Sequence, residues 1–268
     1  MCNQPQRLKM ALAPVRAALL APPPVQRWGL GYIQGGDVLL VRTPKASTTA
    51  VDLAGPLAEI ATDCAIAQAI VEDGFSGTDN TPPFRYRRWL FAQTLAGVRP
   101  SREHTAALEA LAPRLVEHIP EYLRRNIKGR TPSELVFHLV LARLHDEGHI
   151  DDPNLRTATT LRALAATLKQ VLGELENIHP TSVTALGNVA LTNGRSMVVA
   201  RREEPLRLRR LWLNNDRGEP ERGPEAFRGV LLISGGDGSP HEGFEDVPAH
   251  HAVLISRDLQ VTLAEVAL

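Results

Sequence analysis

The sequence predicts a mixed α+β protein, and two observations lead to this fold class. Short apolar runs bounded by turn residues are typical of strands, and they occur near both ends of the chain. Apolar residues at helical spacing are concentrated in the middle. Strands that are grouped apart from helices favour an α+β arrangement over an alternating one. The strand-like runs cover residues 28–42, 64–71, 84–91, 229–234, 252–256 and 261–266.

The composition is that of a soluble globular protein, with 43% hydrophobic and 22% charged residues among 268. The 30 basic residues balance the 30 acidic ones, which argues against nucleic acid or an acidic membrane as a partner. Cys2 and Cys64 are too few for a disulfide framework. Prolines interrupt the start of the chain where a signal peptide would need an apolar run, and no stretch is long enough to span a membrane. We therefore expect a cytoplasmic protein.

The first 24 residues are rich in alanine and proline and allow two interpretations. One is a disordered tail that ends in a proline linker at residues 22–24. In the other, Met1 and Cys2 begin a buried strand and residues 10–20 pack as a short helix. The sequence of this segment alone leaves both open.

A hairpin is predicted next, because Gly35-Gly36 separates two apolar runs in residues 28–42. Gly29 and Gly31 within the first run are expected to allow close strand packing, since no helix start follows them to form a phosphate site. Residues 64–71 then read as a buried strand.

Residues 80–97 read as a turn that feeds a strand. Pro82 and Pro83 cannot donate to a ladder, so pairing is expected to begin after them. From Phe84 to Phe91 the side chains are aromatic, basic or aliphatic, as on a pleated, half-buried surface.

Three helices are predicted in the middle of the chain. One begins at Ser101 and runs to residue 119, with a kink allowed at Pro113. The second begins at Thr131, which has capping-box spacing with Glu134, and Pro132 occupies its first helical position. The third covers residues 157–176, and its apolar stripe is expected to face the core.

Beyond the helices, the chain again has strand character. Residues 191–195 form a turn, and residues 206–213 alternate leucine with arginine, which predicts a strand with a basic face. A solvated face is the simpler interpretation of Arg207, Arg209 and Arg210. These residues, and Arg85, Arg87 and Arg88, are also candidate contacts for an acidic protein partner.

Taken in order, these segments resemble the class II glutamine amidotransferases, which are N-terminal-nucleophile (Ntn) hydrolases. Residues 80–93 resemble the family's Asn-Thr-His-Pro-Phe and Trp-Xaa-Phe-Ala-His segment, and residues 28–45 resemble its first hairpin. Residues 191–195 and 244–259 resemble its Leu-Thr-Asp-Gly turn and closing Arg-Asp-Leu hairpin. The resemblance covers about residues 1–266. It implies a single domain over residues 1–268 with a four-layer αββα sandwich of two antiparallel sheets flanked by helices.

The resemblance also implies a catalytic role for Cys2, because in this family a cysteine exposed by removal of the initiator Met attacks the amide of glutamine. Gln68, Gln93 and Thr94 would lie at substrate-binding positions, with Asn80 in the adjoining turn. Several family residues are replaced. Ile70 stands where the family has the arginine that binds the α-carboxylate, and Pro132 where it has the aspartate that binds the ammonium group. Its oxyanion donors, the side chain of Asn and the backbone of Gly, correspond to Thr94 and Leu95.

These replacements lead to two functional hypotheses, and whether the chain is an enzyme stays open between them. In the first, glutamine hydrolysis is lost or very weak, and the protein is a pseudoenzyme that binds a small neutral ligand or a partner protein. In the second, Cys2 still cleaves or transfers an amide, but one without an amino-acid head group, so that specificity is altered.

No cofactor and no metal are expected. His145 and His149 have i, i+4 spacing but lack the carboxylate of a zinc-protease motif, and His241 with His250 and His251 has no recognised metal spacing. The glycine-rich residues 234–238 are not followed by a helix start that would help to bind phosphate.

Overall fold

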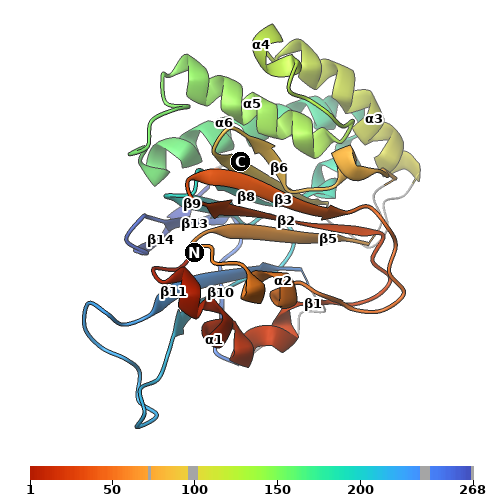
Figure 1. The fold of residues 1–268 in the computed structure, drawn as a ribbon. Coiled ribbons are helices and arrows are strands. Elements are labelled where there is room, and N and C mark those ends of the chain that lie inside the picture. Colours follow the sequence, from red (N-terminus) through yellow and green to blue (C-terminus); the bar gives the residue numbers. More distant parts are fainter. Residues whose placement is uncertain (72–73, 96–101, 236–241, 267–268) are drawn as a thin grey trace.

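A computed structural model describes residues 1–71, 74–95, 102–235 and 242–266, and these form four stacked layers (Figure 1). A helical layer covers one face of a six-stranded antiparallel sheet; its members are α3 (Arg102–Glu117), α4 (Glu121–Arg124), α5 (Pro132–Asp146) and α6 (Thr157–Ile178). The sheet has the strand order β14 (Val261–Glu265), β13 (His251–Ile255), β9 (Met197–Ala200), β8 (Leu186–Thr192), β7 (Trp89–Leu95) and β6 (Phe84–Tyr86).

The third layer consists of two three-stranded antiparallel sheets. One has the order β3 (Asp37–Thr43), β2 (Arg27–Gln34) and β5 (Ala65–Ile70). The other has the order β11 (Arg228–Ser234), β10 (Leu206–Trp212) and β12 (Glu245–Asp246). The fourth layer is small and includes α1 (Leu8–Leu12), α2 (Ala54–Glu59), the 3₁₀ segments at Pro5–Arg7 and Ala13–Leu19, and the strand pair β1 (Leu20–Ala21) and β4 (Val51–Asp52). The predicted αββα sandwich is therefore confirmed.

Alternation along single strands produces the layers. In β7, Trp89 and Phe91 face the helices, whereas Leu90 and Ala92 face the third layer. The rings of Phe91 and Phe137 of α5 are stacked with centroids 5.3 Å apart. Because successive side chains of a strand point to opposite faces, a single apolar run supplies two cores. A third core lies between β10–β11 and the N-terminal helical segments.

The helix and hairpin predictions are confirmed with small shifts at the ends. The stripe of α3 is buried from Leu108 to Leu115 with Pro113 inside the helix, and Ile119 is buried just beyond its end, while Ser101 lies outside the described residues. The hairpin of β2 and β3 turns at Gly35 and Gly36, both at positive φ. No helix among the described ranges is long and apolar enough to cross a membrane. Residues 236–241, which include His241 and most of the glycine-rich loop, also lie outside the described residues.

The predicted strand over residues 84–91 is wrong in one respect, because the structure divides it into the hairpin β6–β7. Phe84 pairs with Phe91 and Tyr86 with Trp89. Arg87, in the turn, has a φ of 50°, a left-handed value that is uncommon for arginine. Without a glycine or asparagine at this position, the sequence carries no hairpin signal.

The prediction of a solvated basic face on residues 206–213 also needs correction. Arg207 is only 7% exposed and pairs with Asp246 of β12 at 3.3 Å. The short strand β12 covers this end of β10, whereas Arg210 at the other end is exposed. The alternation of leucine and arginine cannot show that a neighbouring strand covers one end of β10 and leaves the other end exposed.

Gly29 sets the distance between β2 and the turn before β6. A Cβ atom built on Gly29 would lie 2.1 Å from the backbone oxygen of Pro82. We expect Gly29→Ala to lower the free energy of unfolding by roughly 1–3 kcal/mol, because a backbone atom must move to admit the methyl group.

Gly173→Ala is the matched control in urea unfolding. Gly173 lies inside α6, and no atom outside its own helix lies within 4 Å of the place that a methyl group would take. We expect this variant to be more stable by about 0.5–1 kcal/mol, since alanine favours the helix. Equal effects of the two substitutions would contradict the role given to Gly29.

Candidate functional site

The turn over residues 75–83 forms one wall of the site, and buried polar side chains hold it. Arg27 of β2 is 1% exposed and donates to the carbonyl oxygens of Phe75 (2.6 Å) and Asn80 (3.4 Å). Arg42 of β3 donates to the oxygen of Pro83 at 2.6 Å. Carbonyl groups removed from water need such donors, so these two guanidinium groups stabilise a turn that is exposed over residues 76–79 and buried over residues 80–83.

Asn80 connects this turn to the segment before α5. Its Nδ2 donates to the Ser76 oxygen at 2.7 Å, and its Oδ1 accepts from the Arg130 amide at 2.7 Å. Both ends of the side-chain amide therefore have backbone partners. The substrate-binding role of Asn80 stays a prediction, and these contacts give the residue a clear structural role.

Glu134 holds the other side of the same junction. Thr131 caps α5 as predicted, with its hydroxyl accepting from the Glu134 amide at 3.3 Å. The Glu134 carboxylate, however, does not complete a capping box. It accepts from the amides of Lys128 (2.9 Å) and Gly129 (2.7 Å). Burial raises the pKa of Glu134, while these hydrogen bonds and Arg42 act in the opposite direction.

A small pocket lies between this turn, β5, β7 and the start of α5. Its cavity volume is about 10 Å³, about the minimum for one water molecule. The lining residues carry no formal charge: Ile70, Phe75, Asn80, Pro82, Phe84, Gln93, Thr131, Pro132 and Ser133. Ile70, Gln93 and Pro132, which the resemblance places at substrate-binding positions, thus come together in one place.

Gln93 is a buried amide at the wall of this pocket. The Nε2 of Gln68, which itself does not line the pocket, donates to the backbone oxygen of Gln93 at 2.9 Å. Gln93 is 2% exposed, and among the described residues neither its Oε1 nor its Nε2 has a hydrogen-bond partner. A buried amide without partners is destabilising, so Gln93 brings an unused donor and an unused acceptor to the pocket.

Thr94 takes part in a neighbouring polar cluster. Its hydroxyl accepts from the Asn188 amide of β8 at 2.8 Å, where the pairing of β7 and β8 is irregular. Thr94 and Ser234 also form side-chain hydrogen bonds with Glu204, whose pKa is raised by burial. The predicted Gln68 of β5 and Gln93 and Thr94 of β7 therefore lie together, but of these three only Gln93 is among the residues that line the pocket.

Cys2 lies elsewhere in the fold. Its side chain is 6% exposed and packs with Val15, Leu211 and Phe227 in the third core. Its thiol donates to the Thr62 oxygen at 3.5 Å, and its backbone nitrogen donates to the Asp63 oxygen at 2.8 Å. Thr62 and Asp63 precede β5, whereas Gln68 and Ile70 lie in its second half. From Ala65 to Ile70 a strand rises roughly 16 Å at about 3.3 Å per residue.

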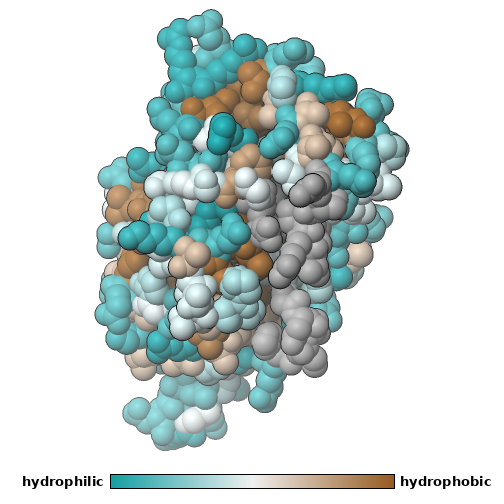
Figure 2. Space-filling model, turned by 90° about the vertical axis from the view of Figure 1, so that its right-hand side faces the viewer, coloured by the Kyte–Doolittle hydropathy of each residue, from teal (hydrophilic) through white to brown (hydrophobic). Residues whose placement is uncertain are grey.

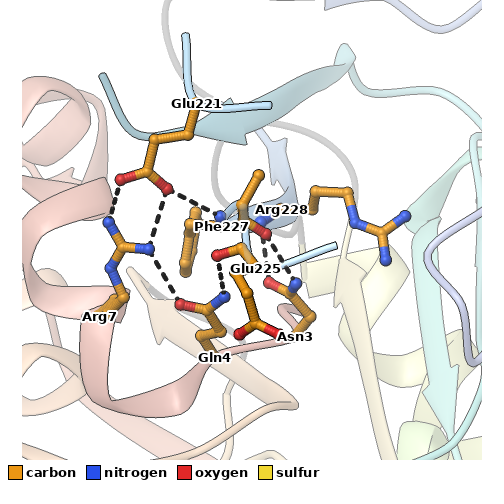
Figure 3. A network of polar contacts seen from close by, with 8 residues as sticks. Asn3, Gln4, Arg7, Glu221, Glu225, Phe227 and Arg228 are labelled. Atoms are coloured by element: carbon orange, nitrogen blue, oxygen red, sulfur yellow. Dashed lines mark hydrogen bonds and ion pairs between the residues drawn. The ribbon is translucent and has the colours of Figure 1, made fainter. Parts of the chain in front are cut away.

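The first residues pair with β11, and a polar network fixes their register (Figure 3). Asn3 donates to the Ala226 oxygen and accepts from the Arg228 amide, while Arg7 forms an ion pair with Glu221. Met1 consequently packs toward the core between the sheets, and Cys2 toward the opposite core. A shift by one residue would exchange these directions. The interpretation of residues 1–24 as a disordered tail is thus wrong. The packed alternative is confirmed in part: residues 8–19 are helical, as α1 and a 3₁₀ segment, but Cys2 forms a single β-bridge with Gly229 in place of a strand.

The environment of Cys2 does not favour a thiolate. Burial raises the pKa of the Cys2 thiol, although the nearby N-terminal charge lowers it. Reactive cysteines usually sit in partly exposed, electropositive surroundings, and buried ones are inert. With Met1 in place, the α-amine belongs to Met1 and donates to the Val230 oxygen at 2.9 Å. Within the described part of the chain, no group of three or more His, Cys, Asp and Glu residues could hold a metal ion.

The sequence did not predict three charged residues around the pocket, of which Arg27 and Glu134 are buried and Arg42 is half-buried. Arg27, Arg42 and Glu134 all support its walls. Arg27 pairs across strands with Ile70 and is buried on the same face. The one signal in the sequence was Arg27 itself, a charged residue that begins the otherwise largely apolar strand β2.

Comparison with solved structures shows the same fold in class II glutamine amidotransferases, whereas no family model and no curated protein matches this sequence. A protein from Silicibacter pomeroyi described as a glutamine aminotransferase class-II domain protein aligns with a TM-score of 0.54 and 18% identity, covering 93% of this chain and 98% of that one. A predicted glutamine amidotransferase from Pseudomonas aeruginosa aligns with a TM-score of 0.52 and 16% identity. This alignment covers 88% of this chain and 86% of that one.

Glutamine phosphoribosylpyrophosphate amidotransferase from B. subtilis, solved with ADP and GMP, aligns with a TM-score of 0.51 and 12% identity. The alignment covers 98% of this chain but 47% of that one, so the present fold corresponds to about half of the larger enzyme. At such identities these structures establish the Ntn-hydrolase fold of class II glutamine amidotransferases, and the function needs an argument from the residues.

The raised pKa of Glu134 predicts a pH-dependent contribution to stability. The folded state holds this proton to a higher pH than the unfolded state does, so the contribution is greatest below the unfolded pKa of about 4.3 and declines as pH rises through the folded value. We expect the stability of the wild type relative to Glu134→Gln to fall as pH rises from about 4. Urea unfolding at a series of pH values measures it, with the exposed Glu109→Gln as charge control; a relative stability that rises with pH would contradict it.

The unpartnered amide of Gln93 predicts an unusual response to substitution. Replacing Gln93 with Met should increase stability by about 1 kcal/mol, because it removes a buried amide that has no partner. Gln68→Met is the control and should decrease stability, since it breaks the hydrogen bond to the Gln93 oxygen. Chemical denaturation compares the two. If Gln93→Met loses as much stability as Gln68→Met, the Gln93 amide must have hydrogen-bond partners from solvent or a ligand.

Proposed function

We propose that this protein has the fold of a class II glutamine amidotransferase without effective glutamine hydrolysis, and that it acts as a cytoplasmic binding or regulatory module. The observation that carries the proposal is the separation of the Cys2 thiol from the pocket. The thiol is enclosed in an apolar core beside the start of β5, while the pocket lies at the other end of that strand. A nucleophile must be within about 3–3.5 Å of the atom it attacks.

The pocket itself provides a second argument. Ile70 cannot pair with an α-carboxylate, and Pro132 cannot pair with an ammonium group. Arg27, the cationic group directly across from Ile70, already donates to two carbonyl oxygens of the 75–83 turn. Loss of one oxyanion donor alone lowers the rate by roughly a hundred- to a thousandfold. An uncharged and nearly filled pocket supports a small neutral ligand at most, and leaves the surface of the protein for a partner.

Cys2-dependent amide hydrolysis with altered specificity is the competing function. Its support is the presence of the thiol itself, at the second position of the chain. It requires that the N-terminal segment release its pairing with β11 and its contacts through Asn3 and Arg7, so that the thiol can reach a substrate.

Ammonia release from glutamine tests the proposal directly. We expect purified wild-type protein to release no more ammonia than Cys2→Ala, measured by a coupled dehydrogenase assay. Steady release that Cys2→Ala abolishes would contradict the proposal.

Thiol labelling addresses the competing function. In a Cys64→Ala background, so that Cys2 is the one thiol, iodoacetamide should label the native protein far more slowly than the protein in urea, as followed by intact mass. The same spectrum shows whether Met1 is present. Rapid labelling of the native state would favour an accessible nucleophile and the amidohydrolase function.

A further inference from the structure

One edge of β10 is open along half of the strand. β11 pairs with β10 over its whole length, but β12 pairs only with Arg207 and Leu208. From Arg209 to Trp212 the edge opposite β11 therefore has no strand partner among the described residues. Such an edge presents a row of backbone donors and acceptors that another extended chain can use.

A hollow of about 240 Å³ runs beside this open edge. Every residue from Arg209 to Asn214 lines it, together with Ala11 and Pro14 of the N-terminal helical segments, and none of its lining residues belongs to β11. Side chains of a strand alternate between faces, so consecutive residues can line one hollow only along the edge. The open edge thus faces a space bounded on one side by Ala11 and Pro14.

Two arginines supply the charge along this edge. Arg209 and Arg210 are the charged groups that line the hollow. The guanidinium of Arg209 lies over the ring of Phe244 and donates to the backbone oxygen of Glu242. Neither of these two contacts is with a carboxylate, so neither neutralises its charge. The Arg210 side chain is 55% exposed, and its ion pair among the described residues is a distant one, to Glu245 at 4.0 Å, which favours its use by another anion.

An apolar part follows the charged part along the same edge. Leu211, Trp212 and Leu213 come directly after the arginines, and Trp212 is 51% exposed. Tryptophan and arginine are the residues most enriched where binding energy is concentrated. The edge therefore offers a charge and an apolar anchor side by side.

We propose that the edge of β10 from Arg209 to Leu213 binds an extended acidic segment of a partner protein by strand addition. Backbone hydrogen bonds to the open edge hold the segment in the hollow. Cross-strand neighbours decide its sequence: acidic residues lie opposite Arg209 and Arg210, and apolar residues lie opposite Leu211 and Trp212. A second copy of this chain is the poorer occupant, because pairing two such edges brings four arginine side chains onto one strand pair.

Other surfaces offer less. On the face shown in Figure 2, the hydrophobic residues that the structure describes gather in several separate groups among hydrophilic ones. Leu39 and Val41 of β3 are 38% and 40% exposed, but nothing beside them indicates the chemistry of a partner. The edge of β10 combines an open ladder, a hollow and a charge. The inference does not depend on the loss of glutaminase activity, so the two proposals can fail separately.

Fluorescence anisotropy with a labelled synthetic peptide tests the proposal. The peptide carries two glutamates next to three β-branched apolar residues, and a second peptide carries two lysines in place of the glutamates. We expect the wild type to bind the glutamate peptide and Arg210→Glu to bind it about tenfold more weakly, with preference moving to the lysine peptide. Arg162→Glu is the matched control, since Arg162 is also exposed and also 4.0 Å from a glutamate, and its binding should not change.

N-methylation of the peptide then separates strand addition from side-chain docking. An added strand uses the N–H groups of alternate residues, so methylating one alternate set should abolish binding and methylating the other should leave it nearly unchanged. Equal effects of the two sets would overturn the proposal. The proposal is also overturned if the glutamate peptide does not bind or if both charged peptides bind equally. It is overturned as well if Arg210→Glu and Arg162→Glu have equal effects, or if the protein forms a dimer that excludes the peptide.

Discussion

The anchoring of the 75–83 turn against β2 and β3 is the constraint on which the candidate site depends. The turn is exposed over residues 76–79 and buried over residues 80–83, and Arg27 and Arg42 supply donors to its carbonyl groups from two adjacent strands. The turn can approach so closely only because Gly29 has no side chain in the path of Pro82. Asn80 and Glu134 then join the turn to the segment before α5. Few of these polar groups remain available to recognise a charged ligand.

This use of charge explains why the pocket is neutral although charged residues surround it. Arg27 lies directly across from Ile70 and on the same face, at the place where a carboxylate-binding group would be expected. Its guanidinium is committed to carbonyl oxygens, and burial lowers the pKa of Arg42 rather than leaving it a freely solvated cation. Among the lining residues, the polar side chains are the uncharged ones of Asn80, Gln93, Thr131 and Ser133. A glutamine zwitterion would meet no complementary charge among the lining residues.

Much of the fold could be predicted from the sequence, because its elements have local signals. Gly35-Gly36 marks a hairpin, Thr131-Pro132 marks a helix start, and the stripe in α6 marks a buried face. The turn at Arg87 carries no such signal, since arginine rarely adopts a positive φ. The cover that β12 gives to Arg207 is equally hidden, because a two-residue strand has almost no pattern of its own.

The candidate site was predictable only in part, for a related reason. The resemblance places Ile70, Gln93 and Pro132 at one site, and the structure brings them together. The resemblance also places Cys2 at this site. Where the thiol actually points depends on the register of the first two or three residues against β11. Register is set by contacts far apart in sequence, such as Asn3 with Ala226 and Arg7 with Glu221, which no local pattern reveals.

The two features that support the proposed loss of glutamine hydrolysis are physically independent. One concerns charge at the end of β5, where Ile70 and Pro132 replace the ionic groups. The other concerns the strand register at the N-terminus, which directs the thiol toward Val15 and Phe227. Restoring a charge in the pocket does not move the thiol, and freeing the thiol does not provide a group that holds the substrate. The β10 edge is a different surface from the pocket, although Ala11 and Pro14 of the N-terminal segment bound its hollow. Its proposed role can therefore be tested whether or not the protein hydrolyses glutamine.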